Sequence, residues 1–197
     1  MAAQETKQRI LAAAFQEFAD YGVAGARVDR IAKNAGCNKN LIYVYFDSKE
    51  NLFATVLDHH LADAYAGLEF TPQDLPDLSR RVFDYAQANP DVYRLLAWAT
   101  LERTAARPPA REREHERKLP LIREQQSVGA VNDAVPPELV LMAVMALATA
   151  WSPAFPFGAT ANPDASLTSA AVREAVGAMV ERIVRPDAID TQPSSQT

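Results

Sequence analysis

The stretch Gly36–Leu52 reads GCNKNLIYVYFDSKENL and says more about the fold than any other part of the chain. Gly36 suits the turn after a helix, because glycine tolerates the positive φ that often follows a helix C-terminus. A short helix with basic and tyrosine side chains comes next, and Asp47 or Ser48 then caps a longer helix. Such side chains crowded onto one short helix are typical of an element that reads DNA, so we expect two further helices behind it.

Two helices are predicted on the N-terminal side of this stretch, over about residues 6–21 and 28–35. Their apolar residues recur at the spacing of one helix face. Asn38 is a good N-cap for a third helix over 39–45. The second and third helices would then form a helix-turn-helix, in which the N-terminal part of the third helix enters the major groove of DNA.

The candidate DNA contacts lie on the third helix and its flanks. Cys37 and Ile42 are expected to point inwards, which leaves the other side of the helix for the groove. Asn40 has the donor and acceptor that pair with adenine, and Leu41 suits the methyl group of thymine. The predicted contact residues are Arg27, Asn38, Lys39, Asn40, Leu41, Tyr43, Tyr45 and Lys49.

Each of these residues has a simpler explanation when it is taken alone. A single lysine on a helix is more often just solvated, and Tyr43 or Tyr45 alone would more often be half-buried in a core. Only their joint register with the turn favours DNA contact. For Cys37, packing is favoured over redox sensing.

Twelve residues fall in the register of the tetracycline-repressor (TetR) family, which this part of the chain therefore resembles. They are Phe18, Gly22, Ile31, Ala32, Gly36, Ile42, Tyr43, Tyr45, Phe46, Ser48, Lys49 and Leu52. The resemblance implies a DNA-binding head over 1–47 and a helical body over 48–185 that binds a small molecule and forms a homodimer. Within the body, 48–66 is the connecting helix that would carry the ligand's signal to the head.

The resemblance is incomplete at four positions. Arg27 stands where the family usually has a threonine that caps the second helix, and Asn38 replaces a serine N-cap. Asn40 and Leu41 replace a common glycine and a common threonine. We therefore expect an operator sequence particular to this protein.

The rest of the chain predicts an all-α protein with about nine helices. Prolines and a linker at 69–76 separate the predicted helices, and no segment alternates as a strand does. The further helices are placed near 74–88, 91–105, 109–128, 137–151 and 167–184. Within 107–123, the mixture of charges predicts a solvated helix interrupted by Pro120. The tail 186–197 lacks apolar periodicity and is predicted to be disordered.

Composition limits the classes of protein to consider. The 197 residues have a net charge of −5, but residues 1–50 hold seven Lys and Arg against six Asp and Glu. This describes a neutral-to-basic head on an acidic body, which would meet phosphates with one face only. The chain has one cysteine, no signal-peptide segment and no apolar run of the roughly 20 residues that a membrane span needs. A cytoplasmic protein that binds no membrane is expected.

Two apolar helices of the body are candidates for pairing with a second copy. The helix near 137–151 is apolar on nearly every face, and the helix near 167–184 offers small residues for close packing. The alternative is that both are simply core. The predicted interface residues are Leu141, Met145, Val172, Val176, Met179 and Ile183.

Large apolar side chains of the body are candidates for a pocket that binds an apolar or aromatic effector. For any one of them, plain core packing is the more frequent role. Near Trp98, Arg94 and Glu102 are candidate charged partners for the ligand, with simple exposure at the surface as the equal alternative. The predicted pocket residues are Tyr85, Tyr93, Trp98, Met142, Met145, Trp151, Phe155 and Phe157.

Signatures of an enzyme are missing from the sequence. His59 and His60 are adjacent and point about 100° apart on a helix, so they cannot chelate one metal. There is no nucleophile elbow, no phosphate-binding glycine loop and no zinc signature. We expect no catalytic residues, no metal and no cofactor. A rival interpretation is a ligand-carrying helical protein that has lost DNA binding.

Overall fold

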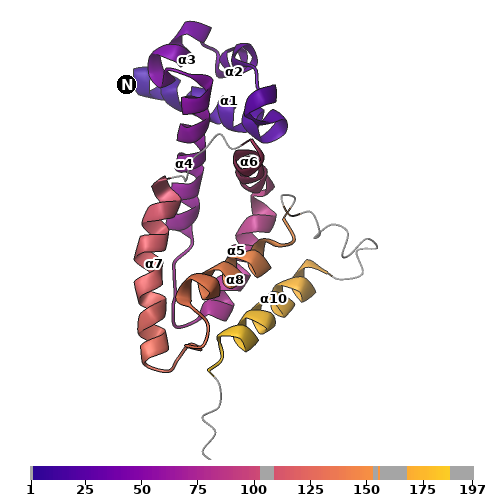
Figure 1. Cartoon of the computed structure of the whole chain (residues 1–197). Coiled ribbons are helices and arrows are strands. Elements are labelled where there is room, and N and C mark those ends of the chain that lie inside the picture. Colours follow the sequence, from indigo (N-terminus) through magenta and orange to yellow (C-terminus); the bar gives the residue numbers. More distant parts are fainter. Residues whose placement is uncertain (1, 103–108, 153–154, 156–167, 187–197) are drawn as a thin grey trace, which may run out of the picture.

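The computed structural model describes residues 2–102, 109–152, 155 and 168–186, and every regular element in these ranges is a helix (Figure 1). The all-α prediction is therefore confirmed. The nine helices of the described ranges are α1 Ala2–Gly25, α2 Val28–Ala35, α3 Lys39–Phe46, α4 Lys49–Gly67, α5 Leu75–Ala88, α6 Pro90–Leu101, α7 Pro109–Ser127, α8 Pro137–Thr149 and α10 Ser169–Val184. The main differences from prediction are a longer α1 and an α6 that ends at Leu101 rather than near 105.

A single long helix, α4, joins the two ends of the molecule (Figure 1). α1, α2 and α3 lie together at one end, and α5, α8 and α10 lie at the other. α7 runs beside the second half of α4 and continues towards α8. The predicted tail from residue 187 onward lies outside the described residues.

The head is held together by large apolar side chains that are excluded from water. Phe18 of α1, Ile31 of α2 and Ile42 of α3 are fully buried in one cluster. Phe53 of α4 meets Phe18 edge-on with ring centroids 5.2 Å apart. Burial of such side chains stabilises the fold by roughly 1.5–3 kcal/mol each, so α4 belongs to the core of the head as much as to the body.

The same core extends to α6. Leu95 and Ala99 are buried in the cluster that holds the head together. The predicted domain boundary at residue 47 divides the chain by sequence order. In the packing, however, α6 of the predicted body shares the hydrophobic core of the head.

The body has its own core between α5, α8 and α10. It is built from Val82 and Phe83 on α5, Val144 on α8, and Val176 and Val180 on α10, all of which are buried. Periodic apolar positions on three helices thus form one layer that closes the far end of the molecule.

The helix α7 departs from its prediction. It continues through Pro120 as one helix, although proline lacks the N–H group for one helical hydrogen bond. It is also not fully solvated, because Ile122 and Lys118 are buried. The Lys118 ammonium lies over the rings of Tyr65 and Phe70, 4.7 and 5.3 Å from their centroids, and 3.2 Å from the Glu114 carboxylate. These contacts pack α7 against the rest of the body, which the charged sequence of this segment did not predict.

Within the described ranges, no helix has the length and apolar character that a membrane span requires.

Candidate functional site

The short helix α3 is held at its start and along one face. Gly36 adopts φ 63° and ψ 42°, the left-handed conformation expected for the turn. The side chain of Asn38 accepts a hydrogen bond from the Asn40 backbone N–H at 2.9 Å, which confirms it as the N-cap. Ile42 and Phe46, one helical turn apart, are buried against the head. The opposite face of α3 is consequently presented to solvent.

That exposed face is formed by Lys39, Asn40, Tyr43 and Val44. Val44 is 75% exposed, which is high for an apolar side chain, and it was missed in the sequence. Positions 39, 40, 43 and 44 follow helical spacing opposite Ile42, so this spacing could have revealed it. Leu41 and Tyr45, in contrast, are only half exposed. The face combines a cation, an amide, a phenol and an apolar side chain, which are groups that contact phosphates and base edges.

Lys39 is already paired in the absence of DNA. Its ammonium lies 2.9 Å from the Asp29 carboxylate of α2. The hydrogen bond and the positive charge of Lys39 lower the pKa of Asp29 below its ordinary value, so Asp29 is ionised at neutral pH. A carboxylate thus stands beside the face that would approach the negatively charged DNA backbone.

Two predicted phosphate contacts lie at the edge of this face. The side chain of Arg27 is exposed and, as expected, makes no cap for α2. Lys49 is half-buried, and its Nζ donates to the Ala26 backbone carbonyl at 3.2 Å. This bond ties the start of α4 to the turn before α2. Because an ammonium carries three N–H donors, two remain for a phosphate.

The orientation of α2 depends on Glu17, which sequence reasoning overlooked. Glu17 is 4% exposed and accepts hydrogen bonds from the Arg27 backbone N–H at 2.7 Å and from Arg30 Nε at 2.9 Å. Burial alone would raise the pKa of Glu17, but the bonds from Arg30 and Arg27 and their charges outweigh it and leave the pKa below its ordinary value. An ionised, buried Glu17 therefore fixes α1 to α2.

A cavity of about 380 Å³ lies between α4, α7 and α8. Its wall is mostly apolar, with a few polar groups from α7. The lining residues are Tyr65, Arg111, His115, Leu119, Glu138, Leu141, Met142, Met145, Ala146 and Thr149. Two of the predicted pocket residues, Met142 and Met145, are among them.

The other predicted pocket residues do not line this cavity, and their role in binding a ligand stays a prediction. They are Tyr85, Tyr93, Trp98, Trp151 and Phe155. Trp98 instead packs towards α1, where its Nε1 donates to the Ala19 carbonyl at 3.2 Å. Trp151 packs against the core of the body. These two tryptophans are used for packing, the more frequent role for such residues. Phe157 lies outside the described residues.

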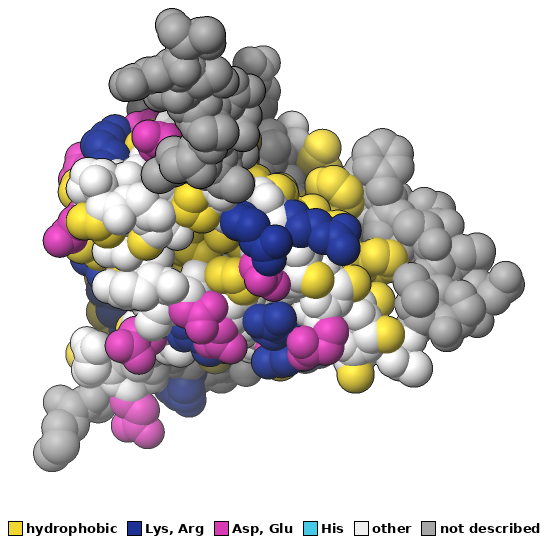
Figure 2. Space-filling model, turned by 90° about the horizontal axis from the view of Figure 1, so that it is seen from below, with side chains coloured by type: hydrophobic (Ala, Val, Ile, Leu, Met, Phe, Trp, Pro, Cys, Tyr) yellow, Lys and Arg dark blue, Asp and Glu magenta, His cyan; other side chains and the backbone are white. Residues whose placement is uncertain are grey.

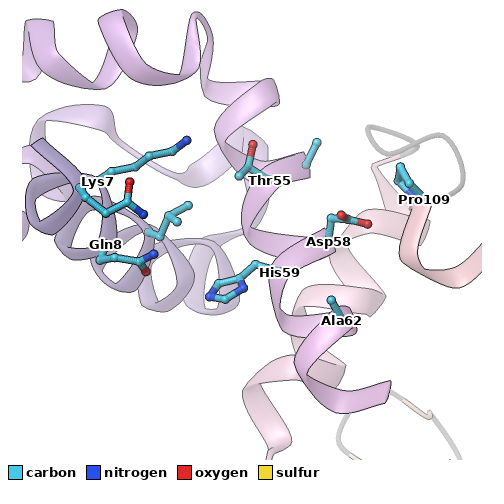
Figure 3. Close-up of a pocket in the computed structure, with 10 residues that line it drawn as sticks. Lys7, Gln8, Thr55, Asp58, His59, Ala62 and Pro109 are labelled. Carbon is cyan, nitrogen blue, oxygen red and sulfur yellow. The ribbon is translucent and has the colours of Figure 1, made fainter. Parts of the chain in front are cut away.

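A second hollow, of about 560 Å³, lies at the junction of head and body. Figure 3 shows Lys7 and Gln8 of α1 on one side of it and Thr55 and His59 of α4 on the other. Asp58, further along its wall, accepts a hydrogen bond from the Ala110 backbone N–H at 2.7 Å. The start of α7 is thereby attached to the middle of α4.

Comparison with known proteins agrees with this arrangement of helices. Residues 10–56 match the family described as bacterial regulatory proteins, tetR family, and residues 74–182 match the tetracyclin repressor-like C-terminal domain. The chain belongs to the TetR family. It is 39% identical over 156 residues to the HTH-type transcriptional repressor SCO4008 of Streptomyces coelicolor, which covers 78% of this chain and 81% of that protein.

Solved structures support the same assignment. The crystal structure of SCO4942 from Streptomyces coelicolor is similar with a TM-score of 0.80 and 37% identity, covering 91% of this chain and 98% of that one. A tetR family regulator from Shewanella sp. PV-4 shares the fold, with a TM-score of 0.68 at 23% identity over 91% of this chain and 97% of that one. TetR-family proteins are DNA-binding transcriptional regulators, so the prediction of a regulator rather than an enzyme is confirmed.

In this TetR-family chain, Arg94 and Glu102 do not reach a ligand pocket. Arg94 lies 3.9 Å from the Asp20 carboxylate of α1. Glu102 accepts hydrogen bonds from the backbone N–H groups of Val23 and Ala24, both at 3.0 Å. Both side chains join the body to the head, and their role in recognising a charged ligand stays a prediction.

The predicted interface residues divide into three groups. Met145 is half-buried and lines the cavity between α4, α7 and α8. Leu141, Val172 and Val176 are buried in the core of one subunit, which favours the alternative that these positions are simply core. Met179 and Ile183 lie on the outer side of α10, and Met179 is 39% exposed. The sequence pattern identified apolar helices but could not separate their inner face from their outer face.

The outer surface of the body remains partly apolar. Leu139 of α8 is 52% exposed, and α10 exposes Ala171, Ala175 and Ala178 beside Met179. Seen from the end that carries the body helices, hydrophobic side chains lie among Lys, Arg, Asp and Glu side chains (Figure 2). A surface of this kind can pair with a second copy through small and apolar residues while its charges keep it soluble.

Proposed function

We propose that this protein is a repressor that binds a palindromic operator as a homodimer and leaves it when a small molecule enters the body. The observation that carries the proposal is the exposed face of α3, where Lys39, Asn40, Tyr43 and Val44 stand opposite the buried Ile42. The relative named as a transcriptional repressor supports the sign of regulation. The proposed place of action is the cytoplasm.

Pairing of two copies follows from the geometry of a helix-turn-helix. A two-fold axis through the body would place two α3 helices about one DNA turn apart, each facing one half-site of a palindrome. The exposed apolar and small residues of α8 and α10 support this pairing. Met179 and Leu139 are the proposed contacts, in place of the buried residues.

Two hydrogen bonds supply a path from the cavity to DNA. Ala110 at the start of α7 is held by Asp58 of α4, and Lys49 at the start of α4 is held to Ala26 before α2. A ligand that moves α7 would therefore pull on α4, and α4 would turn the head. A difference of only a few kcal/mol in ligand affinity between two orientations is enough to release an operator.

The test begins with selection of bound duplexes from a random DNA pool by the full-length protein. We expect enrichment of a palindrome, which Tyr43→Ala and Asn40→Ala should bind more weakly by roughly tenfold, since a good base contact contributes about 1–3 kcal/mol. Arg117→Ala, an exposed position on α7, is the matched control and should bind normally. Failure to enrich any sequence would contradict the proposal and favour a ligand carrier that has lost DNA binding.

A further inference from the structure

Arg111 differs from the neighbouring arginines of α7 in its environment and in its ion pairing. It is half-buried in the wall of the 380 Å³ cavity, and within the described part of the chain it forms no ion pair. The neighbouring Arg113 and Arg117 each face a carboxylate, at 3.8 and 2.8 Å. A guanidinium partly removed from water without a counter-ion is unfavourable, so a ligand that supplied the counter-charge would gain affinity there.

The charge of Arg111 acts on the groups around the cavity. Desolvation lowers the pKa of His115, and the positive charges of Arg111 and Lys118 lower it further. At neutral pH, His115 is therefore neutral and offers a hydrogen bond. Burial raises the pKa of Tyr93, and the charge of Arg111 acts against this rise. Arg111 thus sets a positive potential at this end of the cavity, and His115 adds a donor beside it.

The remainder of the wall has different chemistry. Leu119, Leu141, Met142 and Met145 present apolar surface. Glu138 is the one carboxylate among the described residues of this wall, and its Oε1 lies 2.5 Å from the Arg123 guanidinium. Its charge is balanced by that pair, so no described carboxylate of this wall is left to pair with Arg111.

Two more carboxylates line a hollow on the outer side of Arg111. A separate hollow of about 500 Å³ is lined by Arg111, Glu112, His115 and Glu116. Glu112 and Glu116 do not line the inner cavity. An anion in the outer hollow would lie beside Glu116, whereas the one described carboxylate of the inner wall, Glu138, is already paired with Arg123. The inner side of Arg111 therefore suits an anion better.

We propose that this cavity binds an apolar molecule carrying one anionic group, with the anion on Arg111 and the His115 N–H and the apolar part against the leucine and methionine side chains. This refinement rests on the proposed function, in which the cavity is the effector site. The planar guanidinium presents paired N–H groups that match a carboxylate in two parallel hydrogen bonds.

Calorimetry on the full-length protein without DNA tests this charge preference. Two sets of matched probes are used, octanoate with octanamide and octylammonium, and 2-naphthoate with 2-naphthamide and 2-naphthylmethylammonium. In at least one set, we expect the carboxylate to bind at least tenfold more tightly than the uncharged and the cationic member. The proposal is overturned if neither carboxylate shows this preference, including the case in which none of the probes binds.

Substitutions then locate the anion. Arg111→Gln should weaken binding of the preferred carboxylate about tenfold and leave the amide unchanged, and Arg111→Lys should restore part of the loss because it keeps the charge. Arg113→Gln on the same helix is the control and should leave both probes unchanged. Helical circular dichroism and thermal unfolding establish that each variant is folded. A carboxylate that binds Arg111→Gln as tightly as the unmodified protein would refute the assignment.

A DNA-release assay separates this proposal from the proposed function. If the preferred carboxylate binds through Arg111 but leaves the selected operator bound, the ligand class stands and release by this cavity fails. If an uncharged or cationic probe binds more tightly and releases the operator, the proposed function stands and the anionic ligand is wrong.

Discussion

The carboxylate of Glu102, at the end of α6, lies 3.0 Å from the backbone nitrogen of Val23 in α1. The same oxygen is 3.0 Å from the nitrogen of Ala24. Both N–H groups follow Gly22, where φ 65° and ψ −175° interrupt the helix. Glu102 therefore acts as a cap supplied by a distant helix, and it fixes the angle at which the head leaves the body.

Removing this cap should destabilise the protein. Glu102→Ala leaves two N–H groups without their charged acceptor, so we expect the free energy of unfolding to fall by about 1–3 kcal/mol. Urea denaturation followed by circular dichroism measures this change. Glu124→Ala, an exposed glutamate near the end of α7, should alter the value by less than about 0.5 kcal/mol. Equal stability of the two variants would contradict the capping role.

Gly22 should tolerate no side chain. A Cβ there would lie 2.3 Å from Glu102 Oε1 and 2.8 Å from the ring of Trp98, and φ is positive. Gly22→Ala should therefore lower the midpoint of thermal unfolding, by an amount equivalent to more than about 1 kcal/mol. Gly67→Ala is the matched control, because no atom lies within 4 Å of the added carbon. A neutral Gly22→Ala would show that the α1–α6 contact is more open than the structure indicates.

The sequence was sufficient to predict what depends on neighbours along the chain. The αL glycine at 36 and the N-cap at Asn38 are local features, and both are as expected. The family register also placed Ile42 on the buried side. Periodicity over four to eight residues determines which side of a short helix is apolar, so the exposed face of α3 was largely predictable.

The cavity between α4, α7 and α8 and the exposed apolar side of α10 depend on packing between distant helices, and the sequence could not predict them. Val176 and Met179 are both apolar and lie on the same helix, yet one is core and the other is exposed. Trp98 looked suited to a ligand but hydrogen-bonds to α1. Arg111, in a charged segment, gave no sign that it lines a cavity. The sequence cannot tell whether such a residue is buried in the core, exposed or part of a cavity wall. That depends on which helix packs against it.

Glu17 should make stability depend on pH. Its pKa is lowered in the folded state, so its contribution is complete above the unfolded value near 4.5 and is lost as the pH falls through the folded pKa. Glu17→Gln should thus be less stable than the unmodified protein by about 1–3 kcal/mol at pH 7. The difference should shrink below about pH 4. Denaturation curves at pH 7 and pH 3.5 measure it, and a difference that is equal at both would show that Glu17 is not acting through its charge.

If two copies pair through the outer side of α10, arginine substitutions at Val176 and at Met179 on this helix should have different outcomes. Met179→Arg should yield a folded monomer, because Met179 is exposed in one subunit. Val176→Arg should unfold the subunit, because Val176 is fully buried and an unpaired charge there is costly. Analytical ultracentrifugation together with circular dichroism distinguishes the two results. If Met179→Arg remains a dimer with unchanged dissociation constant, the interface lies elsewhere.

The ion pair between Lys39 and Asp29 predicts that removing an acidic residue strengthens DNA binding. Asp29 lies beside the face of α3 that we propose to contact DNA, and its carboxylate lies 2.9 Å from the Lys39 ammonium. Asp29→Asn removes a charge that repels phosphates and frees Lys39 to reach one, so affinity for the selected operator should rise severalfold.

The salt dependence of operator affinity shows whether the change in binding comes from contacts with phosphates. Lys39→Ala should lower affinity across all sequences and reduce the slope of log K against log salt concentration by about 1, since one phosphate contact is lost. Asp29→Asn should make that slope steeper or leave it unchanged, and Asp133→Asn, in the turn after α7, should have no effect. Fluorescence anisotropy at a series of salt concentrations measures all three. Weaker binding by Asp29→Asn would mean that the pair aligns Lys39 for DNA instead of competing with the phosphates for it.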